Sequence, residues 1–369
     1  MKTRAAVLWD RNKEWSVEAI ELDPPKSGEV LVSLAGSGLC HSDEHVVTGD
    51  LPSAVPIIGG HEGAGIVQEV GPGVTGLAPG DRVIFSFIPS CGQCRPCATG
   101  MGSLCEIGRY TQGGRQISDQ TARHHARGQD LGLMCFLGTF AEHTVVNQAS
   151  CVKVEDDLAL DVACLLGCGV ITGWGSVVYT GEARAGDTVV VVGVGGIGIN
   201  AVQGAVAAGA EYIVAVDPVA FKREKALEFG ATHAVATSEE ATALVAELTR
   251  GRMANVCVNT MGVGDGAQIG ASLHLVGKRG RVVVTNIHPA AETQVTMSAL
   301  ELTTYEKQVR GSLFGSSNPR ADIPRMLELH RSGKLKLAEL RTRTYTLGEV
   351  NLGYDDMRNG RNLRGVITF

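Results

Sequence analysis

The chain has 369 residues, 44% of them hydrophobic, which is enough for two domains and a large core. Its formal net charge of −6 weighs against nucleic acid or an anionic membrane surface as a partner. The N-terminal stretch MKTRAAVLWD lacks the apolar core of a signal peptide, so we expect a cytoplasmic protein. In a reducing compartment its ten cysteines favour metal or redox roles over disulfides.

The first part of the chain is predicted to be rich in β-strands. Short apolar runs alternate there with Gly and Pro, as expected of strands joined by turns. These runs are RAAVLWD, EVLVSLAGSG, GAGIVQEVG and DRVIFSF.

After about Gly169, strand-like and helix-like segments alternate. The series begins with DTVVVVG, IGINAVQGAVAAG and EYIVAVD and continues to RGRVVVTN, which predicts a parallel, doubly wound sheet. The uncharged window 188–210 is long enough to cross a bilayer, but it changes from a β-branched run to a glycine turn and then a helix. We therefore expect no membrane span there.

Beyond about Ser312 the chain holds a helix, ADIPRMLELHRSG, and a last strand, RGVITF. The whole pattern is typical of the α/β class. We expect a β-rich domain over residues 1–169, a nucleotide-binding domain over 170–311, and a segment 312–369 that returns to the first domain.

The run VVVVGVGGIG predicts a dinucleotide site. Its glycines Gly193, Gly195 and Gly198 have the spacing G-x-G-x-x-G, follow a buried strand and open a helix, so phosphates can approach the helix N-terminus. Asp217 ends the next strand, where its carboxylate would accept hydrogen bonds from the adenosine ribose and repel a 2′-phosphate. This favours NAD over NADP. The alternative is a glycine turn with Asp217 capping a local group.

Four cysteines lie in a stretch of about residues 90–106 that is short of apolar residues. Their pattern, C-x2-C-x2-C-x7-C, can close a tetrahedron of thiolates around Zn²⁺ and leaves no position for a substrate, so such a zinc would be structural. An iron–sulfur cluster or unpaired structural cysteines remain alternatives. The residues are Cys91, Cys94, Cys97 and Cys105.

A second, scattered set bears more directly on function. Cys40, His61 and Cys168 would hold a zinc ion and leave its fourth position open, and Glu62 stands beside His61. Taken singly, each residue also fits a buried cysteine or a core histidine.

With these motifs together, the chain resembles the zinc-containing medium-chain alcohol dehydrogenases over essentially its whole length. GHEGAGIVQEVGPGV is similar to their zinc signature, CGQCRPC with Cys105 to their structural zinc lobe, and GVGGIG with Asp217 to their coenzyme site. The resemblance implies a GroES-like, β-rich catalytic domain, a Rossmann coenzyme domain, two zinc ions per chain and NAD(H).

The resemblance also implies roles for single residues. Cys40, His61 and Cys168 would bind the catalytic zinc, with Glu62 as a transient ligand or neighbour, and Asp43 would orient His61. Ser42 and His45 match the proton relay of the family. The implied coenzyme contacts are His41, Thr172, Gly193, Gly195, Gly196, Ile197, Gly198, Asp217, Lys222 and Arg364, and the implied substrate pocket includes Leu51, Phe87 and Arg109.

Two features bear on the subfamily. CEIGRYTQGG, with Arg109, resembles the glutathione-dependent formaldehyde dehydrogenases, although Leu51 replaces their usual acidic residue. The stretch 118–140 is more similar to the actinobacterial nicotinoprotein alcohol dehydrogenases, which keep NAD(H) bound and accept a nitrosoaniline as oxidant. We interpret His124 and His125 in this stretch as solvated loop residues. We expect Cys135, Cys151, Cys164 and Cys257 to act as small buried hydrophobic residues.

The resemblance therefore implies a zinc-dependent enzyme that transfers a hydride between a small alcohol or aldehyde and NAD(H), working as a homodimer or homotetramer. One alternative substrate is a thiol–formaldehyde adduct. A non-catalytic protein on the same fold is the alternative outside enzymes.

Overall fold

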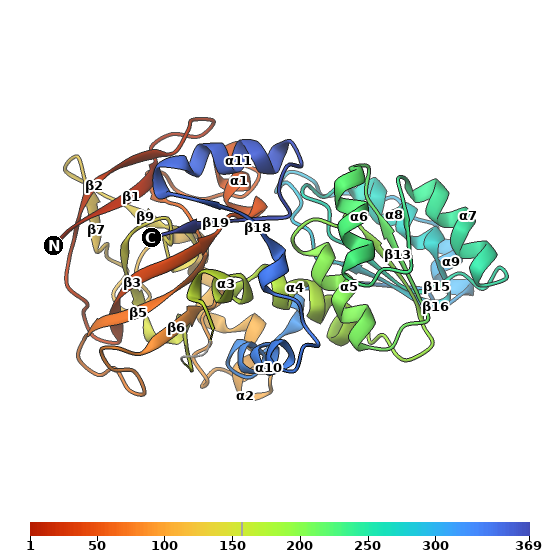
Figure 1. Ribbon diagram of the computed structural model, residues 1–369, viewed down its shortest axis with the longest axis horizontal. Helices are drawn as coiled ribbons and strands as arrows, with labels where there is room; N and C mark the ends of the chain where they lie inside the picture. Colours follow the sequence, from red (N-terminus) through yellow and green to blue (C-terminus); the bar gives the residue numbers. More distant parts are fainter. Residues whose placement is uncertain (156–157) are drawn as a thin grey trace. The chain divides into compact units, whose positions relative to one another are not determined.

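The protein is described by a computed structural model that covers residues 1–155 and 158–369, including all their side chains except those of 110–112. It divides into two compact units, both drawn in Figure 1. Unit 1 comprises residues 1–168, 318–332 and 337–369, and unit 2 comprises residues 169–317 and 333–336.

Unit 1 is built mainly of two sheets. The first has the strand order β8-β7-β2-β1-β4-β9, with β1 Lys2–Leu8, β2 Ser16–Leu22, β4 Ile57–Ile58, β7 His124–Ala126, β8 Gln129–Asp130 and β9 Gly132–Leu133. The second has the order β11-β6-β5-β3-β19-β18, with β10 also paired to β3. Its strands are β3 Glu29–Gly38, β5 Glu62–Val70, β6 Arg82–Phe85, β10 His143–Asn147, β11 Cys151–Val154, β18 Arg341–Tyr345 and β19 Arg364–Thr368.

Strand β3 is central to the second sheet. Its residues are almost continuously buried, because β5, β10 and β19 all pair with it in antiparallel register. The last strand of the chain thereby pairs Val366 with Gly38, two residues before Cys40. The helices of unit 1 are α1 His41–Thr48, α2 Arg95–Ala98, α3 Leu160–Ala163, α10 Pro319–Arg331 and α11 Val350–Arg358, with short helical turns η1 Gly102–Leu104, η2 Glu106–Gly113, η3 Met134–Phe136, η4 Gln148–Ser150, η5 Cys164–Gly167, η8 Ala338–Leu340 and η9 Leu347–Glu349.

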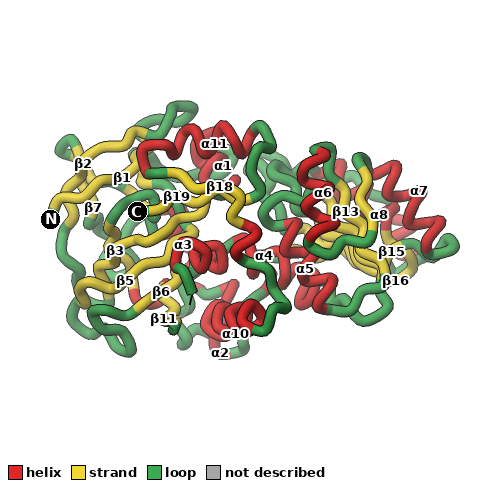
Figure 2. The backbone as a smooth tube through the Cα atoms, viewed as in Figure 1, coloured by secondary structure: helices red, strands yellow, loops and turns green. Residues whose placement is uncertain are grey.

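Unit 2 alternates strands and helices, as the colours of Figure 2 show. All its strand pairs are parallel, in the order β14-β13-β12-β15-β16-β17. The chain adds β13 and β14 on one side of β12 and then returns to add β15, β16 and β17 on the other side, so the strand order reverses between β12 and β15. The elements are α4 Gly169–Gly175, the π-helical turn η6 Ser176–Thr180, β12 Thr188–Val192, α5 Gly198–Ala207, β13 Tyr212–Val216, α6 Ala220–Glu228, β14 His233–Val235, α7 Ser238–Leu248, β15 Ala254–Asn259, α8 Gly266–Leu275, β16 Val276–Val284, α9 Ala299–Thr304, β17 Gln308–Gly311 and η7 Phe314–Ser316.

This sheet confirms the predicted doubly wound α/β fold. Helices α5 and α6 lie on one face and α7 and α8 on the other (Figure 1), so all five residues of β12 are buried. Dinucleotides bind such sheets at the carboxyl ends of the strands where the order reverses, which here is between β12 and β15. The window 188–210 forms β12, a turn and α5, as expected from its change of composition.

No single helix among the described residues has both the length and the apolar composition of a membrane span. One bent pair, residues 160–167 with 169–180, meets those two criteria together.

The interpretation of His124 as a solvated loop residue is wrong. His124 is fully buried in β7, with its Nε2 atom 3.3 Å from the Thr144 hydroxyl. Its neighbour Arg123 is also fully buried, because the guanidinium forms two 2.8 Å hydrogen bonds with the carboxylate of Glu29. His125 is half-buried between Asp23 and Asp130. A distant acidic partner therefore allows a polar-looking segment to enter the core.

We expect His124 to make the fold less stable in mild acid. Burial lowers its pKa to about 3, helped by the charges of His125 and Arg123. Because the unfolded chain takes up this proton near pH 6.5 and the folded chain does not, stability falls as the pH drops below that value. Between pH 7 and pH 5.5, the free energy of unfolding of His124→Gln should therefore fall by about 1 kcal/mol less than that of wild type.

Urea unfolding at the two pH values measures this difference, and His233→Gln is the control because that side chain is partly exposed and lies in unit 2. Equal losses in wild type and His124→Gln would contradict the assignment.

Candidate active site and metal centres

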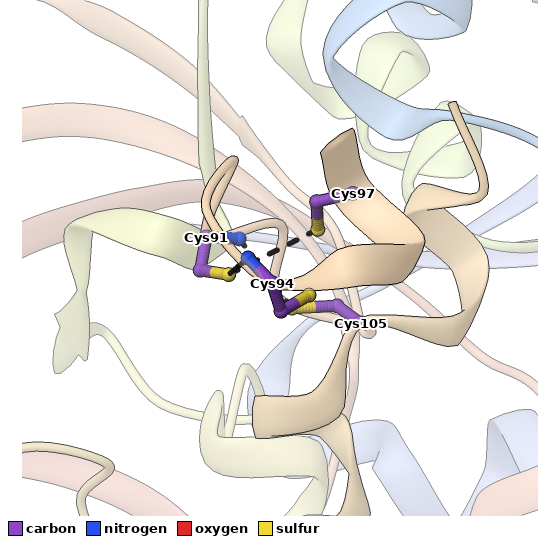
Figure 3. Close-up of side chains that lie close together, drawn as sticks. All are labelled: Cys91, Cys94, Cys97 and Cys105. Atoms are coloured by element: carbon purple, nitrogen blue, oxygen red, sulfur yellow. Dashed lines mark hydrogen bonds between the residues drawn. The ribbon is translucent and has the colours of Figure 1, made fainter. Parts of the chain in front are cut away.

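The four clustered cysteines converge on one point in unit 1. Their sulfur atoms all lie within 4.8 Å of one another, and all four are free thiols. Figure 3 shows them reaching inward from a loop and from the short helix α2. The Cys91 and Cys97 sulfurs are 4.0 Å apart, and those of Cys94 and Cys105 are 3.9 Å apart. Four thiolates at about 2.3 Å from a tetrahedral zinc would be about 3.8 Å from each other, so the set fits Zn²⁺.

Backbone N–H groups already favour thiolates in this cluster. The Cys91 sulfur accepts hydrogen bonds from the N–H groups of Gln93 and Cys94. Backbone hydrogen bonding, led by Glu106, lowers the pKa of Cys94 to about 7, while burial raises that of Cys105 to about 12. A bound cation would favour the deprotonated form of both. Four protein ligands would complete the tetrahedron, so a zinc held here would have no open position for a substrate.

The scattered set also meets at one point. Ligand atoms of Cys40, His61, Glu62 and Cys168 lie within 4.8 Å of one another, and each residue is at most 6% exposed. The sheet and its loops bring them together: Cys40 links β3 to α1, Glu62 begins β5, and Cys168 follows η5. Two thiols and an imidazole form a ligand set typical of a zinc with an open fourth position.

The metal-free ligands compete for protons. A hydrogen bond from the Cys168 thiol lowers the pKa of Cys40, and the same interaction with Cys40 raises that of Cys168. Burial opposes a charge on His61, but Asp43 and Cys40 together raise its pKa. Zn²⁺ would replace these shared protons and remove the cost of burying thiolates.

Asp43 holds His61 from α1. Its Oδ2 atom lies 3.1 Å from His61 Nδ1, and its Oδ1 atom accepts a 2.8 Å hydrogen bond from the Gly60 N–H. Gly60 has φ +85°, and a Cβ there would lie 2.5 Å from the Phe140 ring. This leaves Nε2 of His61 as the nitrogen available to a metal, as in carboxylate–histidine–zinc arrangements.

Glu62 forms a buried ion pair with Arg364. Arg364 Nη2 donates to Glu62 Oε2 and, at 3.1 Å, to the Leu39 carbonyl. Burial raises the pKa of Glu62 to about 7, although the guanidinium acts against that rise. A Cβ on Gly38 would lie 2.1 Å from Glu62 Oε2, so only glycine leaves room for the pair. The predicted contact of Arg364 with a coenzyme pyrophosphate stays a prediction.

Helix α1, which was not predicted, carries the polar residues near the metal set. Ser42 Oγ lies 3.6 Å from the Cys40 sulfur. His45 is 2% exposed and its Nδ1 atom lies 3.2 Å from Asp50 Oδ2, while the His41 ring packs edge-on against it. Asp50, whose side chain is 30% exposed, was missed by sequence reasoning. A carboxylate five residues after His45 in the sequence was the available signal.

The predicted pocket residues fall in different surroundings. The Phe87 ring packs edge-on against the His61 ring at 5.9 Å between centroids. Leu51 packs on a hydrophobic cluster that includes Val46 and Leu8. Arg109 is exposed in η2. The pocket roles of all three stay predictions.

The glycine turn of unit 2 forms a cradle at the carboxyl end of β12. A Cβ on Gly198 would lie 1.9 Å from the Gly193 carbonyl, so helix and turn pack closely, whereas a Cβ on Gly195 would have no described atom within 4 Å apart from its chain neighbours. This open space suits a phosphate close to the backbone. Asp217, at the end of β13, accepts hydrogen bonds from Val194 N–H at 3.0 Å and Val219 N–H at 2.9 Å.

The other predicted coenzyme residues of unit 2 lie near this turn or in α4 and α6. The Gly196 carbonyl accepts a 2.8 Å hydrogen bond from Asn200, and the Ile197 carbonyl packs on Gly173 of α4. Thr172, also in α4, has a buried hydroxyl without a hydrogen-bond partner among the described residues. Lys222 is half-buried in α6.

Comparison with known proteins agrees with this geometry. Residues 26–156 match the alcohol dehydrogenase GroES-like domain, and residues 196–332 match the zinc-binding dehydrogenase domain. The chain is 53% identical to the NDMA-dependent alcohol dehydrogenase of Amycolatopsis methanolica, over 100% of this chain and 99% of that protein. This chain belongs to the zinc-binding alcohol dehydrogenase family.

Solved structures support the same family. An alcohol dehydrogenase zinc-binding domain protein from Burkholderia ambifaria superposes with a TM-score of 0.93 at 30% identity, covering 100% of this chain and 99% of that one. Benzyl alcohol dehydrogenase from Acinetobacter calcoaceticus gives a TM-score of 0.90 at 28% identity with the same coverage. The predicted family, fold class and enzyme class, and zinc as a cofactor, are confirmed for this alcohol dehydrogenase.

We expect two zinc ions per chain with different roles. Cys40→Ala should lose one zinc and all turnover but stay folded. Cys97→Ala should lose the other zinc and lower the unfolding midpoint by at least about 5 °C, because a structural zinc contributes folding energy. Elemental analysis and thermal unfolding measure both effects, with Cys257→Ala as the control thiol outside either set. A Cys97→Ala protein that melts with wild type would falsify the structural role.

Proposed function

We propose that this chain oxidises small primary or secondary alcohols, and reduces the aldehydes or ketones, through zinc and NAD(H), with unit 1 as the catalytic domain and unit 2 as the coenzyme domain. The observation that carries the proposal is the buried Cys40, His61 and Cys168 set with the Ser42 hydroxyl beside it. The predicted boundaries after residues 169 and 311 belong to this proposal.

Zinc held by Cys40, His61 and Cys168 would lower the pKa of an alcohol hydroxyl, and NAD(H) would carry the hydride. The protein residues supply position and proton transfer. Asp43 fixes the ring of His61, and Arg364 neutralises Glu62 so that no uncompensated carboxylate faces the substrate. Ser42 Oγ takes the substrate proton.

His45 receives this proton next, because it lies three residues beyond Ser42 on the same face of α1. Because His45 is buried, we add Asp50 as the exit: it contacts His45 and its side chain reaches solvent.

Removing the relay should slow alcohol oxidation most at low pH, where hydroxide cannot replace the missing base. We expect His45→Gln to reduce kcat at least tenfold near pH 6 and much less near pH 10, and Asp50→Asn to act in the same direction more weakly. The pH profiles of kcat from pH 6 to 10 measure this, with His233→Gln in unit 2 as the control. If the His45→Gln profile parallels that of wild type, His45 is outside the proton path.

Asp217 and the glycine cradle support NAD as the coenzyme, and likeness to the NDMA-dependent enzyme supports its retention through turnover. Retention requires slow release. A Kd near 1 nM with association at about 10⁶ M⁻¹s⁻¹ gives a residence time of roughly a quarter of an hour. Such an enzyme needs an acceptor that reoxidises the bound NADH in place.

We expect the gel-filtered protein to oxidise benzyl alcohol with a nitrosoaniline acceptor and no added NAD, and to release about one coenzyme per chain on denaturation. The ultraviolet spectrum of the supernatant measures the released coenzyme. Activity that appears only when NAD is added, with none released, would return this protein to the dehydrogenases that exchange coenzyme each turnover.

The remaining predictions are kept as proposals. No observation favours the thiol–formaldehyde adduct, and the same assay with that substrate tests it. The edge strand β17 and helix α9 expose Leu300, Tyr305 and Val309, which supports a homo-oligomer. The ten free thiols support a reducing compartment such as the cytoplasm.

A further inference from the structure

In unit 2, one side-chain amide has no hydrogen-bond partner among the residues that the structure describes. Both Oδ1 and Nδ2 of Asn286 are buried, and neither has a hydrogen-bond partner among the described residues. Asn286 is the one described residue with two such orphaned atoms. Two residues along, Nε2 of His288 is buried and orphaned in the same way. Native structures rarely leave such groups unpaired unless a ligand or water completes them.

These orphaned groups lie at the carboxyl edge of the sheet. Asn286 follows the end of β16 by two residues, and the Gly264 N–H donates a 2.8 Å hydrogen bond to the Ile287 carbonyl between Asn286 and His288. A Cβ on Gly264 would lie 2.5 Å from the His288 ring, so this loop packs on the one that follows β15.

The glycine turn belongs to the same edge. A Cβ on Gly193 would lie 2.9 Å from the backbone of Met261, in the loop after β15. The loops after β12, β15 and β16 are therefore consecutive neighbours, in the order of their strands.

A doubly wound sheet binds a dinucleotide with one nucleotide on each half. Asp217, after β13, marks the half that would hold the adenosine, so Asn286, after β16, lies in the half that would hold the nicotinamide riboside. The nicotinamide carboxamide has a carbonyl oxygen that accepts and an NH2 group that donates, so it can pair with the Asn286 amide through one hydrogen bond in each direction.

Resting on the proposed function, we infer that Asn286 pairs with the nicotinamide carboxamide of the coenzyme, and that His288 adds a second polar contact to the same half of NAD(H). Asn286 is then a residue that determines coenzyme retention. The pairing is made only when coenzyme is bound, so the amide contributes to binding and costs free energy in the coenzyme-free fold.

The effect of a substitution on the stability of the coenzyme-free protein therefore distinguishes a binding residue from a structural one. Replacing Asn286 with leucine, which has the same number and branching of side-chain heavy atoms and no polar ones, should leave the coenzyme-free protein at least as stable as wild type. The same change should weaken NAD⁺ binding tenfold or more. Asn286→Ala is the second variant, in case leucine disturbs the loop. Asn255→Leu is the matched control, because Asn255 lies at the opposite end of the sheet, where it accepts a hydrogen bond from the Thr188 N–H.

The test is isothermal titration of coenzyme-free wild type and variants with three ligands. NAD⁺ carries the carboxamide, 3-acetylpyridine adenine dinucleotide lacks its N–H donor, and ADP-ribose lacks the nicotinamide. We expect Asn286→Leu and Asn286→Ala to lose affinity for NAD⁺, to lose the preference of wild type for NAD⁺ over the acetylpyridine analogue, and to bind ADP-ribose within twofold of wild type.

An unchanged ratio of NAD⁺ to ADP-ribose affinity in both variants would overturn this inference alone. Loss of ADP-ribose affinity, or a lower unfolding temperature of both coenzyme-free variants, would mean that Asn286 supports the fold instead. A wild type that binds no NAD⁺ would overturn the proposed function and this inference together.

Discussion

The core of unit 1 depends on burying ionisable side chains away from water. Cys40, His61 and Cys168 meet at one point in the core of unit 1, where a lone thiolate or imidazolium is costly. Without a metal, Cys40 and Cys168 share a proton through a hydrogen bond, and the carboxylate of Asp43 raises the pKa of His61. A divalent cation resolves all three conflicts at once. The ligand set is therefore evidence for zinc beyond the identity of its residues.

The need to pack these buried ionisable groups together also explains two glycines next to them. Gly38 ends β3 where the Glu62 carboxylate and the Arg364 guanidinium must fit, and Gly60 turns the chain so that His61 enters next to Asp43. Strand β19 brings Arg364 from the end of the sequence to this place by pairing with β3. Glu62 is thus held by a cation that comes from the protein, while the thiols are left for the metal.

Much of this could be predicted from the sequence, because strands such as β3 and β12 carry continuous apolar runs and the ligands stand in compact motifs. Helix α1 was not predicted because its sequence, HSDEHVVT, consists largely of polar residues and has little apolar periodicity. His124 was misjudged because the residue that lets its neighbour Arg123 enter the core, Glu29, lies 94 positions earlier. Asn286 carries no motif, and only its unpaired amide marks it.

Asp217 shows how two interpretations of one residue can both hold. It caps the local N–H groups of Val194 and Val219, the alternative left open by its position at a strand end. A carboxylate has about four acceptor positions, so two hydrogen bonds leave two for the ribose hydroxyls. The residue that would select NAD over NADP therefore also fixes the loop that would receive the phosphates. Coenzyme choice and the shape of the cradle are coupled through this one side chain, and a substitution that admits a 2′-phosphate must also replace two backbone hydrogen bonds.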